Sequence, residues 1–344
     1  MLIEKDNWRR KTMYSTTTDK PCEEICYEDS HIDKVLAEIK KNFEPYFIDF
    51  LETSAGTTIS SEQFKALQQK FGTTSSTLKS NTDYTKAFKG IFEKSIEAYE
   101  KDREKYLKLL EPSNLEEYQY DPAQFKNQAL KNECPIIHGT IMNKKAKELD
   151  GYRRDFNRAN ANDLLQVMMN ISEFVHSYKS KYYKPENYLS IKSYKDLNLE
   201  IMDQEGYFYY GVLGGGIKSL ILYKFDPEVF SYRSKNAIWS LWYLSNKQKF
   251  ECKQDSEFLI IDLKHSVTKQ NYFYPYELFS KYAFEIFKLL NSKAKELNVN
   301  LNPEYRYVIV DAFFEHVANK HAAEIADLSH EFNEDGFDYG TLGY

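Results

Sequence analysis

The stretch EFLIIDLK, residues 257–264, indicates the fold class of the C-terminal half of the chain. Four apolar residues in a row between polar ones are typical of a buried strand. A second strand-like segment, residues 248–253, precedes it, and the connection Gln254-Asp255-Ser256 is short enough for a hairpin. The two segments therefore predict the first two strands of a sheet.

The residues after this hairpin predict the rest of the sheet. A helix is expected at about 276–297, a third strand at 305–310 (YRYVIV) and a terminal helix at about 312–332. The order strand, strand, helix, strand implies a small mixed sheet flanked by helices.

The N-terminal half has the spacing of helices instead. Apolar residues recur at helical intervals in four segments, at about 30–43, 60–71, 84–110 and 162–180. Pro45 is expected to end or kink the first of these helices, and residues 112–150 are expected to be irregular. Two more helices are expected at about 217–225 and 234–244.

These patterns predict an α+β protein that is predominantly helical. We expect a loose N-terminal arm at 1–28, a helical domain at 29–150 and a mixed α/β domain at 151–344, which carries the candidate functional site.

Composition limits the classes of protein to which the chain can belong. It has 344 residues, a formal net charge of −6, four cysteines, 28 tyrosines and 23 phenylalanines. The overall basicity of many nucleic-acid-binding proteins is absent, although local basic patches remain possible. Four scattered cysteines do not suggest a disulfide framework. Since neither a signal peptide nor an apolar run of about 18 residues is evident, we expect a cytoplasmic protein with no membrane contact.

The predicted strand 257–264 also carries candidate catalytic residues. Alternation along a strand places Asp262 and Lys264 on the same face. A carboxylate can hold Mg²⁺, and a nearby lysine can orient or deprotonate a water molecule that attacks a phosphodiester. Glu251 is the candidate for the second metal ligand beside Asp262, with Asp255 and Glu257 as alternatives. A plain core strand with a soluble end is the competing interpretation.

Residues 248–310 resemble the PD-(D/E)xK nuclease superfamily on the basis of these residues and of the predicted order of elements. The Pro-Asp element of the first motif of that superfamily is absent. The resemblance implies a Mg²⁺-dependent DNA nuclease, a hydrolase, with Glu251, Asp262 and Lys264 as catalytic residues. A role in restriction or antiviral defence against phage would fit by analogy.

A glycine-rich turn is the second candidate site. Gly214, Gly215 and Gly216 lead directly into a predicted helix, whose free N–H groups could meet a phosphate. Residues 209–242 resemble helix-hairpin-helix DNA-binding modules. The resemblance implies that the three glycines, Lys218 and Arg233 contact nucleic acid, but the catalytic aspartate of related glycosylases is missing. A tight turn that merely packs against a helix is the alternative.

Residues 176–195 form a third candidate site, which we call the basic-aromatic segment. Basic charge interleaved with aromatic rings suits phosphate contacts and base stacking. The residues expected to bind nucleic acid are Lys179, Lys181, Lys184, Tyr182 and Tyr183. A solvated helix end in a lysine-rich protein is the competing interpretation.

Two classes of function follow from these observations. The first is a protein that acts on nucleic acid, with Mg²⁺ as cofactor if it is a nuclease. The second is a non-catalytic module that binds nucleic acid, or that binds a protein partner or a second copy of itself through its tyrosine-rich surface. Cys22, Cys26 and His31 have the spacing to begin a zinc site, but the sequence suggests no fourth ligand nearby.

Overall fold

The computed structural model describes residues 21–54, 81–253, 256–262 and 267–329, and all structural statements below concern these residues. The chain is predominantly helical with one small antiparallel sheet, as predicted. The first helices are α1 (Cys22–Ile25), α2 (Asp29–Ser54), α4 (Asn81–Glu100), α5 (Arg103–Leu109), α6 (Pro112–Glu117), α7 (Pro122–Gln124), the π-helix η3 (Phe125–Glu133), α8 (Pro135–Met142), α9 (Asp150–Arg158) and α10 (Ala161–Tyr182).

The second half continues with helices around the small sheet. Its elements are α11 (Pro185–Tyr188), α12 (Gly215–Phe225), α13 (Lys235–Leu244), β1 (Leu259–Asp262), β2 (Val267–Gln270), α14 (Tyr276–Glu296), α15 (Arg306–Lys320) and α16 (Ala322–Ser329). Short 3₁₀ turns lie at Tyr118–Tyr120, Lys147–Leu149, Tyr194–Leu197, Glu200–Asp203 and Pro303–Tyr305.

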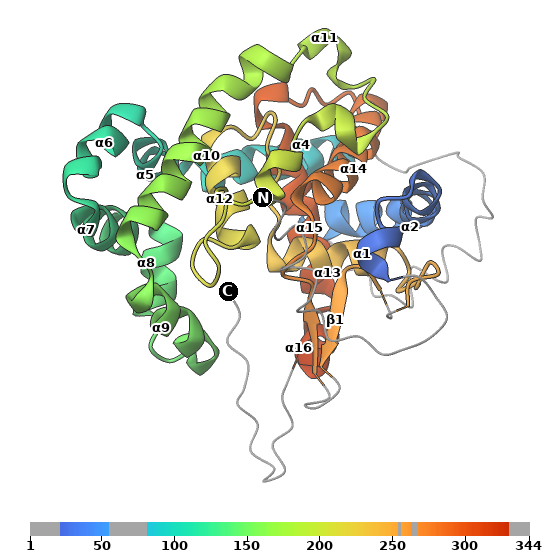
Figure 1. The fold of residues 1–344 in the computed structure, drawn as a ribbon. Helices are drawn as coiled ribbons and strands as arrows, with labels where there is room; N and C mark the ends of the chain where they lie inside the picture. Colours follow the sequence, from blue (N-terminus) through green and yellow to red (C-terminus); the bar gives the residue numbers. More distant parts are fainter. Residues whose placement is uncertain (1–20, 55–80, 254–255, 263–266, 330–344) are drawn as a thin grey trace.

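The helices form two groups that meet at α12 (Figure 1). In one group α6, α7 and η3 pack along α10, and α9 packs on α8. In the other group α2, α4, α13 and α14 pack around α15. Helix α12 contacts α5, which joins the two groups.

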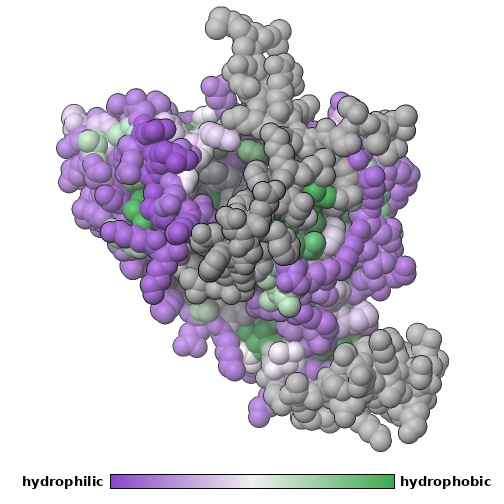
Figure 2. All heavy atoms as spheres, turned by 90° about the horizontal axis from the view of Figure 1, so that it is seen from below, coloured by the Kyte–Doolittle hydropathy of each residue, from purple (hydrophilic) through white to green (hydrophobic). Residues whose placement is uncertain are grey.

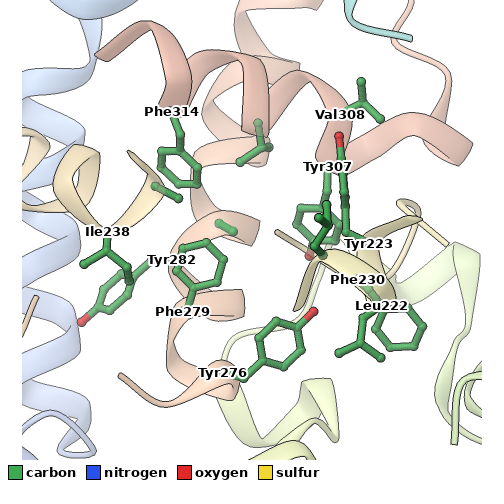
Figure 3. Close-up of a cluster of buried hydrophobic side chains, with 14 of the residues drawn as sticks. Leu222, Tyr223, Phe230, Ile238, Tyr276, Phe279, Tyr282, Tyr307, Val308 and Phe314 are labelled. Atoms are coloured by element: carbon green, nitrogen blue, oxygen red, sulfur yellow. The ribbon is translucent and has the colours of Figure 1, made fainter. Parts of the chain in front are cut away.

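Helix α14 supplies much of the core beneath α12, α13 and α15. Its aromatic residues Tyr276, Phe279 and Tyr282 are almost completely buried. Phe279 lies toward Phe314 of α15 and Tyr282 beside Ile238 of α13, whereas Tyr276 points toward Phe230 and donates to Ser231 O (Figure 3). One continuous hydrophobic cluster extends from Cys26 to Ile325 and so includes residues on both sides of position 150. The predicted domain boundary at that position stays a prediction.

The predicted strand at 305–310 is wrong, because Tyr305 ends a 3₁₀ turn and residues 306–310 begin helix α15. Tyr307, Val308, Ile309 and Val310 are all almost fully buried, so this turn of the helix is apolar on every side. An apolar run of this length does not distinguish a buried strand from a buried helix. Phe313, Phe314 and Val317 continue the buried face of the same helix.

The predicted strand at 248–253 is also wrong. Phe250 and Glu251 have φ angles of 47° and 67°, and Asn246 and Lys247 just before them are left-handed too. Left-handed backbone cannot continue a strand. The hairpin instead pairs β1 with β2, with Leu259 opposite Gln270 and Asp262 opposite Val267.

Further expectations about the helices need correction. Residues 112–150 are mostly short helices rather than irregular chain, and the helix expected at 84–110 is divided into α4 and α5. Helix α2 does not end at Pro45 but continues to Ser54, with tertiary packing from α4, α13, α14 and α15, and a kink at Pro45 stays a prediction. Part of the expected loose arm is α1, in which Cys22 and Ile25 are buried. The helix expected at 60–71 lies outside the described residues.

The surface of the described chain is mainly hydrophilic on the face shown in Figure 2, with hydrophobic residues in small patches. No helix among the described residues has the length and apolar character that crossing a membrane requires.

Candidate functional site

A cavity of about 530 Å³ lies where the two groups of helices meet. Its walls come from five parts of the chain: α8 to α9, the 3₁₀ turn Glu200–Asp203, the segment before and into α12, Arg233, and the segment before α14. The residues that line it are Thr140, Leu149, Tyr152, Asp203, Phe208, Tyr210, Gly211, Val212, Gly214, Gly215, Gly216, Ile217, Lys218, Arg233, Tyr272, Phe273, Tyr274 and Pro275. Its volume falls in the range of roughly 300–1,000 Å³ that is typical of small-molecule sites.

The N-terminus of α12 opens onto this cavity. Gly214 is the N-cap residue in extended conformation, and no side chain caps the helix. The first N–H groups of a helix have no acceptor within the helix, and they carry the positive end of its dipole. Gly214, Gly215 and Gly216 therefore present polar, electropositive backbone to the cavity.

The turn before α12 depends on another glycine. Gly211 has a φ of 78°, and a Cβ atom at this position would lie 2.7 Å from Asp155 Oδ2. Both the left-handed backbone and the close contact with α9 require glycine here.

Arg233 lies directly over the first turn of α12. A Cβ atom on Gly215 would lie 1.5 Å from Arg233 Nη2, so only glycine allows the guanidinium to occupy this position. Nη1 donates to Asn271 O at 3.3 Å and Nη2 to Tyr272 O at 2.8 Å. Nε is buried without a hydrogen-bond partner among the described residues. The guanidinium thus joins α12 to the segment before α14 and retains an unused donor.

Lys218 is a second buried cation in the cavity wall. Only 2% of its surface is exposed, its Nζ donates to Met202 O, and it lies 3.7 Å from Asp203 Oδ1. Burial lowers the pKa of Lys218 to about 8, and burial lowers the pKa of Arg233 to about 10. Among the described residues that line the cavity, Asp203 is the one carboxylate, so two cations face one anion there. Buried charge of this kind is costly unless a counter-charge is present.

Aromatic rings form most of the remaining wall. Tyr210 and Tyr272 are 57% and 54% exposed, which is unusual for large aromatic side chains in this protein. The rings of Tyr210 and Phe273 are parallel to within 4°, with centroids 6.3 Å apart. The Tyr152 hydroxyl is buried without a hydrogen-bond partner among the described residues. The cavity is thus lined by the cations Lys218 and Arg233 and by aromatic rings.

The basic-aromatic segment has a different arrangement. Lys179 Nζ lies 2.7 Å from Asp226 Oδ2 and 2.6 Å from Glu228 Oε2. Tyr183 donates to Glu228, so these two predicted binding residues hold α10 against the start of the loop after α12. Lys181, Lys184 and Tyr182 are exposed. None of the five residues lines the cavity.

The residues predicted to bind Mg²⁺ are only partly described. The backbone of Asp262 ends β1, its side chain is not described, and Lys264 lies outside the described residues. Glu251 is exposed, and its Oε1 lies 2.7 Å from Lys34 Nζ on α2. Within the described ranges, no three histidine, cysteine or acidic side chains are arranged to hold a metal ion.

Of the alternative acids, Asp255 lies outside the described residues and Glu257 is deeply buried. Glu257 Oε1 lies 3.2 Å from His31 Nε2, and Oε2 accepts a hydrogen bond from Tyr274 at 3.0 Å. His31 Nδ1 lies 3.1 Å from Phe250 O. Although burial opposes protonation, Glu257 raises the pKa of His31. This buried pair holds α2 to the hairpin segment.

The sequence predicted five of the cavity residues as members of one site, namely Gly214, Gly215, Gly216, Lys218 and Arg233. It missed Asp203, Tyr152, Tyr210 and the segment Tyr272–Tyr274. The only sequence signal for these was a high frequency of tyrosine, which does not indicate which rings share a site.

No protein-family model, curated protein sequence or solved structure matches this chain significantly. What the chain binds is therefore inferred from its own residues.

Proposed function

We propose that this chain is a binding protein whose cavity holds the phosphate group of a phosphorylated ligand, and that nucleic acid is the source of that phosphate. One observation carries the proposal: the buried guanidinium of Arg233 lies against the uncapped N-terminus of α12 and retains a buried donor. Lys218 adds a second cation with a single carboxylate to balance both. A phosphate would supply the missing negative charge and accept hydrogen bonds from the free N–H groups.

The proposal contains no cleavage step. The Mg²⁺-dependent nuclease reaction predicted from Glu251, Asp262 and Lys264 stays a separate prediction. Glu251, its one described side chain, is paired with Lys34 at the surface.

A reducing compartment such as the cytoplasm fits the proposal. The four cysteines Cys22, Cys26, Cys134 and Cys252 are buried, and no disulfide joins them in the described part of the chain. Burial raises the pKa of the Cys134 thiol to about 12, which keeps it in its unreactive protonated form.

Calorimetric titration with ribose 5-phosphate, inorganic phosphate and ribose tests the proposal. We expect both phosphorylated compounds to bind and ribose not to bind. Arg233→Gln should weaken binding about 10- to 100-fold, since hydrogen bonds to charged groups contribute about 1.5–3 kcal/mol each. Equal binding of ribose and ribose 5-phosphate would show that the cavity does not recognise phosphate.

A second variant guards against loss of folding in Arg233→Gln. A Cβ atom on Gly214 meets no other atom within 4 Å, so Gly214→Ala should fold normally while its methyl group fills space at the end of α12. Gly139→Ala on α8 is the matched control, because its Cβ atom also has open space and Gly139 does not line the cavity. The Gly214 variant should weaken binding of ribose 5-phosphate, and the Gly139 variant should not. The double variant Lys181→Gln/Lys184→Gln should also leave this binding unchanged.

A further inference from the structure

The charged residues of the cavity wall leave one positive charge in excess. Among the described residues that line it, Lys218 and Arg233 are the two cations and Asp203 is the one carboxylate. Lys218 and Arg233 are 2% and 5% exposed, so water and salt screen their charges little. The other lining side chains are uncharged, and most of them are apolar or aromatic. One negative charge therefore neutralises this wall, and a second one meets no further cation among these residues.

Asp203 is held in the wall by contacts with two helices. Its Oδ2 accepts a hydrogen bond at 2.7 Å from the backbone N–H of Tyr276, the first residue of α14. Its Oδ1 lies 3.7 Å from Lys218 Nζ on α12, and the same Nζ donates to O of Met202, the residue before Asp203. Because both carboxylate oxygens have partners, Asp203 cannot turn away from an incoming anion without losing these contacts.

A neighbouring carboxyl group responds to the charge of Asp203. Glu277 lies in the first turn of α14 and is 8% exposed. Burial raises the pKa of Glu277 to about 7, and the negative charges of Asp203 and Glu200 act in the same direction. Further negative charge close to Asp203 is therefore unfavourable.

Phosphate groups differ in the charge that they would bring to this wall. A phosphomonoester, as at the end of a strand or in a free nucleotide, carries nearly two negative charges at neutral pH. A phosphodiester inside a nucleic-acid strand carries one. The diester would leave the wall neutral, whereas the monoester would leave an unpaired negative charge in a buried site, which is costly. The cavity volume of about 530 Å³ has room for substituents on both sides of a diester.

From this charge balance we infer that the cavity binds a phosphodiester, as found inside a nucleic-acid strand, more tightly than a terminal phosphate, and that Asp203 is the residue that determines this specificity. The inference rests on the proposed function, because the N-terminus of α12, Arg233 and Lys218 hold the phosphate in either case. Asp203 supplies one of the two negative charges that the cations require, so the ligand supplies only the other.

Calorimetric titration of the unmodified protein near neutral pH with ribose 5-phosphate and with its methyl phosphodiester tests the inference. The two ligands share the sugar and differ in the charge of the phosphate. The diester should bind about 10-fold more tightly or better, because it leaves no unpaired charge in the cavity. If ribose 5-phosphate binds as tightly as the diester, the inference fails and the proposed phosphate site stands. If neither ligand binds, the proposed function itself fails.

Asp203→Asn tests the role assigned to this residue, with sulfate and methyl sulfate as a doubly and a singly charged ligand. Asparagine keeps an oxygen that can accept from Tyr276 N but removes the charge. Burial lowers the pKa of Lys218 to about 8 and Asp203 opposes that shift, so both proteins are titrated at about pH 6, where Lys218 is protonated. The unmodified protein should prefer methyl sulfate. The variant should shift the ratio of the two affinities toward sulfate by about 10-fold or more.

Asp163→Asn is the matched control for this change of charge. Asp163 also lies in the first turn of a helix, α10, but it is exposed and does not line the cavity. This variant should leave both affinities unchanged, and circular dichroism establishes that each variant is folded. An unchanged ratio in folded Asp203→Asn would overturn the assignment of Asp203. The titrations of the unmodified protein do not depend on the folding of any variant.

A second pair of singly charged diesters distinguishes nucleic acid from a lipid headgroup as the source of the phosphate. A dinucleoside monophosphate should bind more tightly than glycerophosphoglycerol, because its nucleosides can bury apolar surface against the mainly apolar wall. Equal or tighter binding of glycerophosphoglycerol would overturn nucleic acid as the source of the diester.

Discussion

The cavity beside α12 and the basic-aromatic segment 176–195 contain similar residue types, but they differ in how many carboxylates lie beside their cations. In the segment, Lys179 is neutralised by two carboxylates within 2.7 Å. In the cavity, Lys218 and Arg233 share one carboxylate, Asp203. The first arrangement stabilises the fold, and the second leaves positive charge for a ligand. The number of basic residues in a segment therefore says little until their partners are known.

Of the substitutions proposed here, Gly215→Ala should have the largest effect, because it disturbs the cavity and leaves the basic-aromatic segment intact. The new methyl group would occupy the position of the Arg233 guanidinium, so the arginine must move. We expect a loss of about 1–3 kcal/mol in the free energy of unfolding, typical of overpacking. Binding of ribose 5-phosphate should fall by about 10- to 100-fold. Urea denaturation and calorimetry measure the two effects.

The double variant Gly215→Ala/Arg233→Ala tests whether the clash with Arg233 causes the loss of stability. If the clash explains the loss, adding Gly215→Ala to Arg233→Ala should change stability little, because the two residues act through one contact. Full additivity of the two effects would contradict the role assigned to this contact.

A change of pH should have a smaller effect, and its sign should differ between ligand affinity and the stability of the free protein. Burial lowers the pKa of Lys218 to about 8 from an ordinary value near 10.5, so the lysine loses its charge as pH rises through 8. Affinity for ribose 5-phosphate should therefore fall by up to about tenfold between pH 7 and 9. Titration calorimetry at several pH values measures it, and Lys218→Met should remove the decline.

Without ligand, the free energy of unfolding should instead rise with pH over part of this range. Between pH 8 and 10.5 the unfolded chain binds the Lys218 proton and the folded chain does not, so this group makes the free energy of unfolding rise with pH. Denaturation without ligand tests this sign. A decline in affinity that persists in Lys218→Met would exclude Lys218 as its source.

Lys179→Ala should have the smallest effect, and on stability rather than on binding. Burial raises the pKa of Asp226, and removal of Lys179 leaves this carboxylate without its cation. Because Lys179 is partly exposed, we expect a loss of only about 1 kcal/mol in the free energy of unfolding. Lys181→Ala, nearby and exposed, should change it by less than about 0.5 kcal/mol. Loss of oligonucleotide binding in Lys179→Ala at unchanged stability would instead favour the segment as a binding surface.

Local signals predicted much of the fold. Helices α10, α13 and α14 lie close to their expected positions because each has a clear apolar periodicity, and α10 and α13 also begin at the side-chain caps Asn160 and Ser234. The strands at 248–253 and 305–310 were predicted wrongly for a tertiary reason. Residues 307–310, in the first turns of α15, are buried on all sides, so their apolar run looks like a strand. Four left-handed residues between 246 and 251 form a turn that short apolar patterns do not reveal.

The site was predictable only where its residues are close in sequence. Gly214 to Gly216, Lys218 and Arg233 lie within 20 positions, and their chemistry pointed to phosphate. Asp203 and the rings of residues 272–274 join them only through tertiary structure, namely the packing of α14 on the 3₁₀ turn Glu200–Asp203 and the hydrogen bonds from Arg233 to Asn271 O and Tyr272 O. The same limit explains Lys179, whose partners Asp226 and Glu228 lie 47 and 49 residues away.

The contact between Gly215 and Arg233 has a consequence for how this protein can change over evolutionary time. As long as an arginine occupies position 233, any side chain at position 215 collides with it. Position 215 becomes free to vary only after position 233 has lost its long side chain. The order of the two substitutions is therefore constrained, and related chains should pair glycine with arginine at these positions or have changed the arginine first.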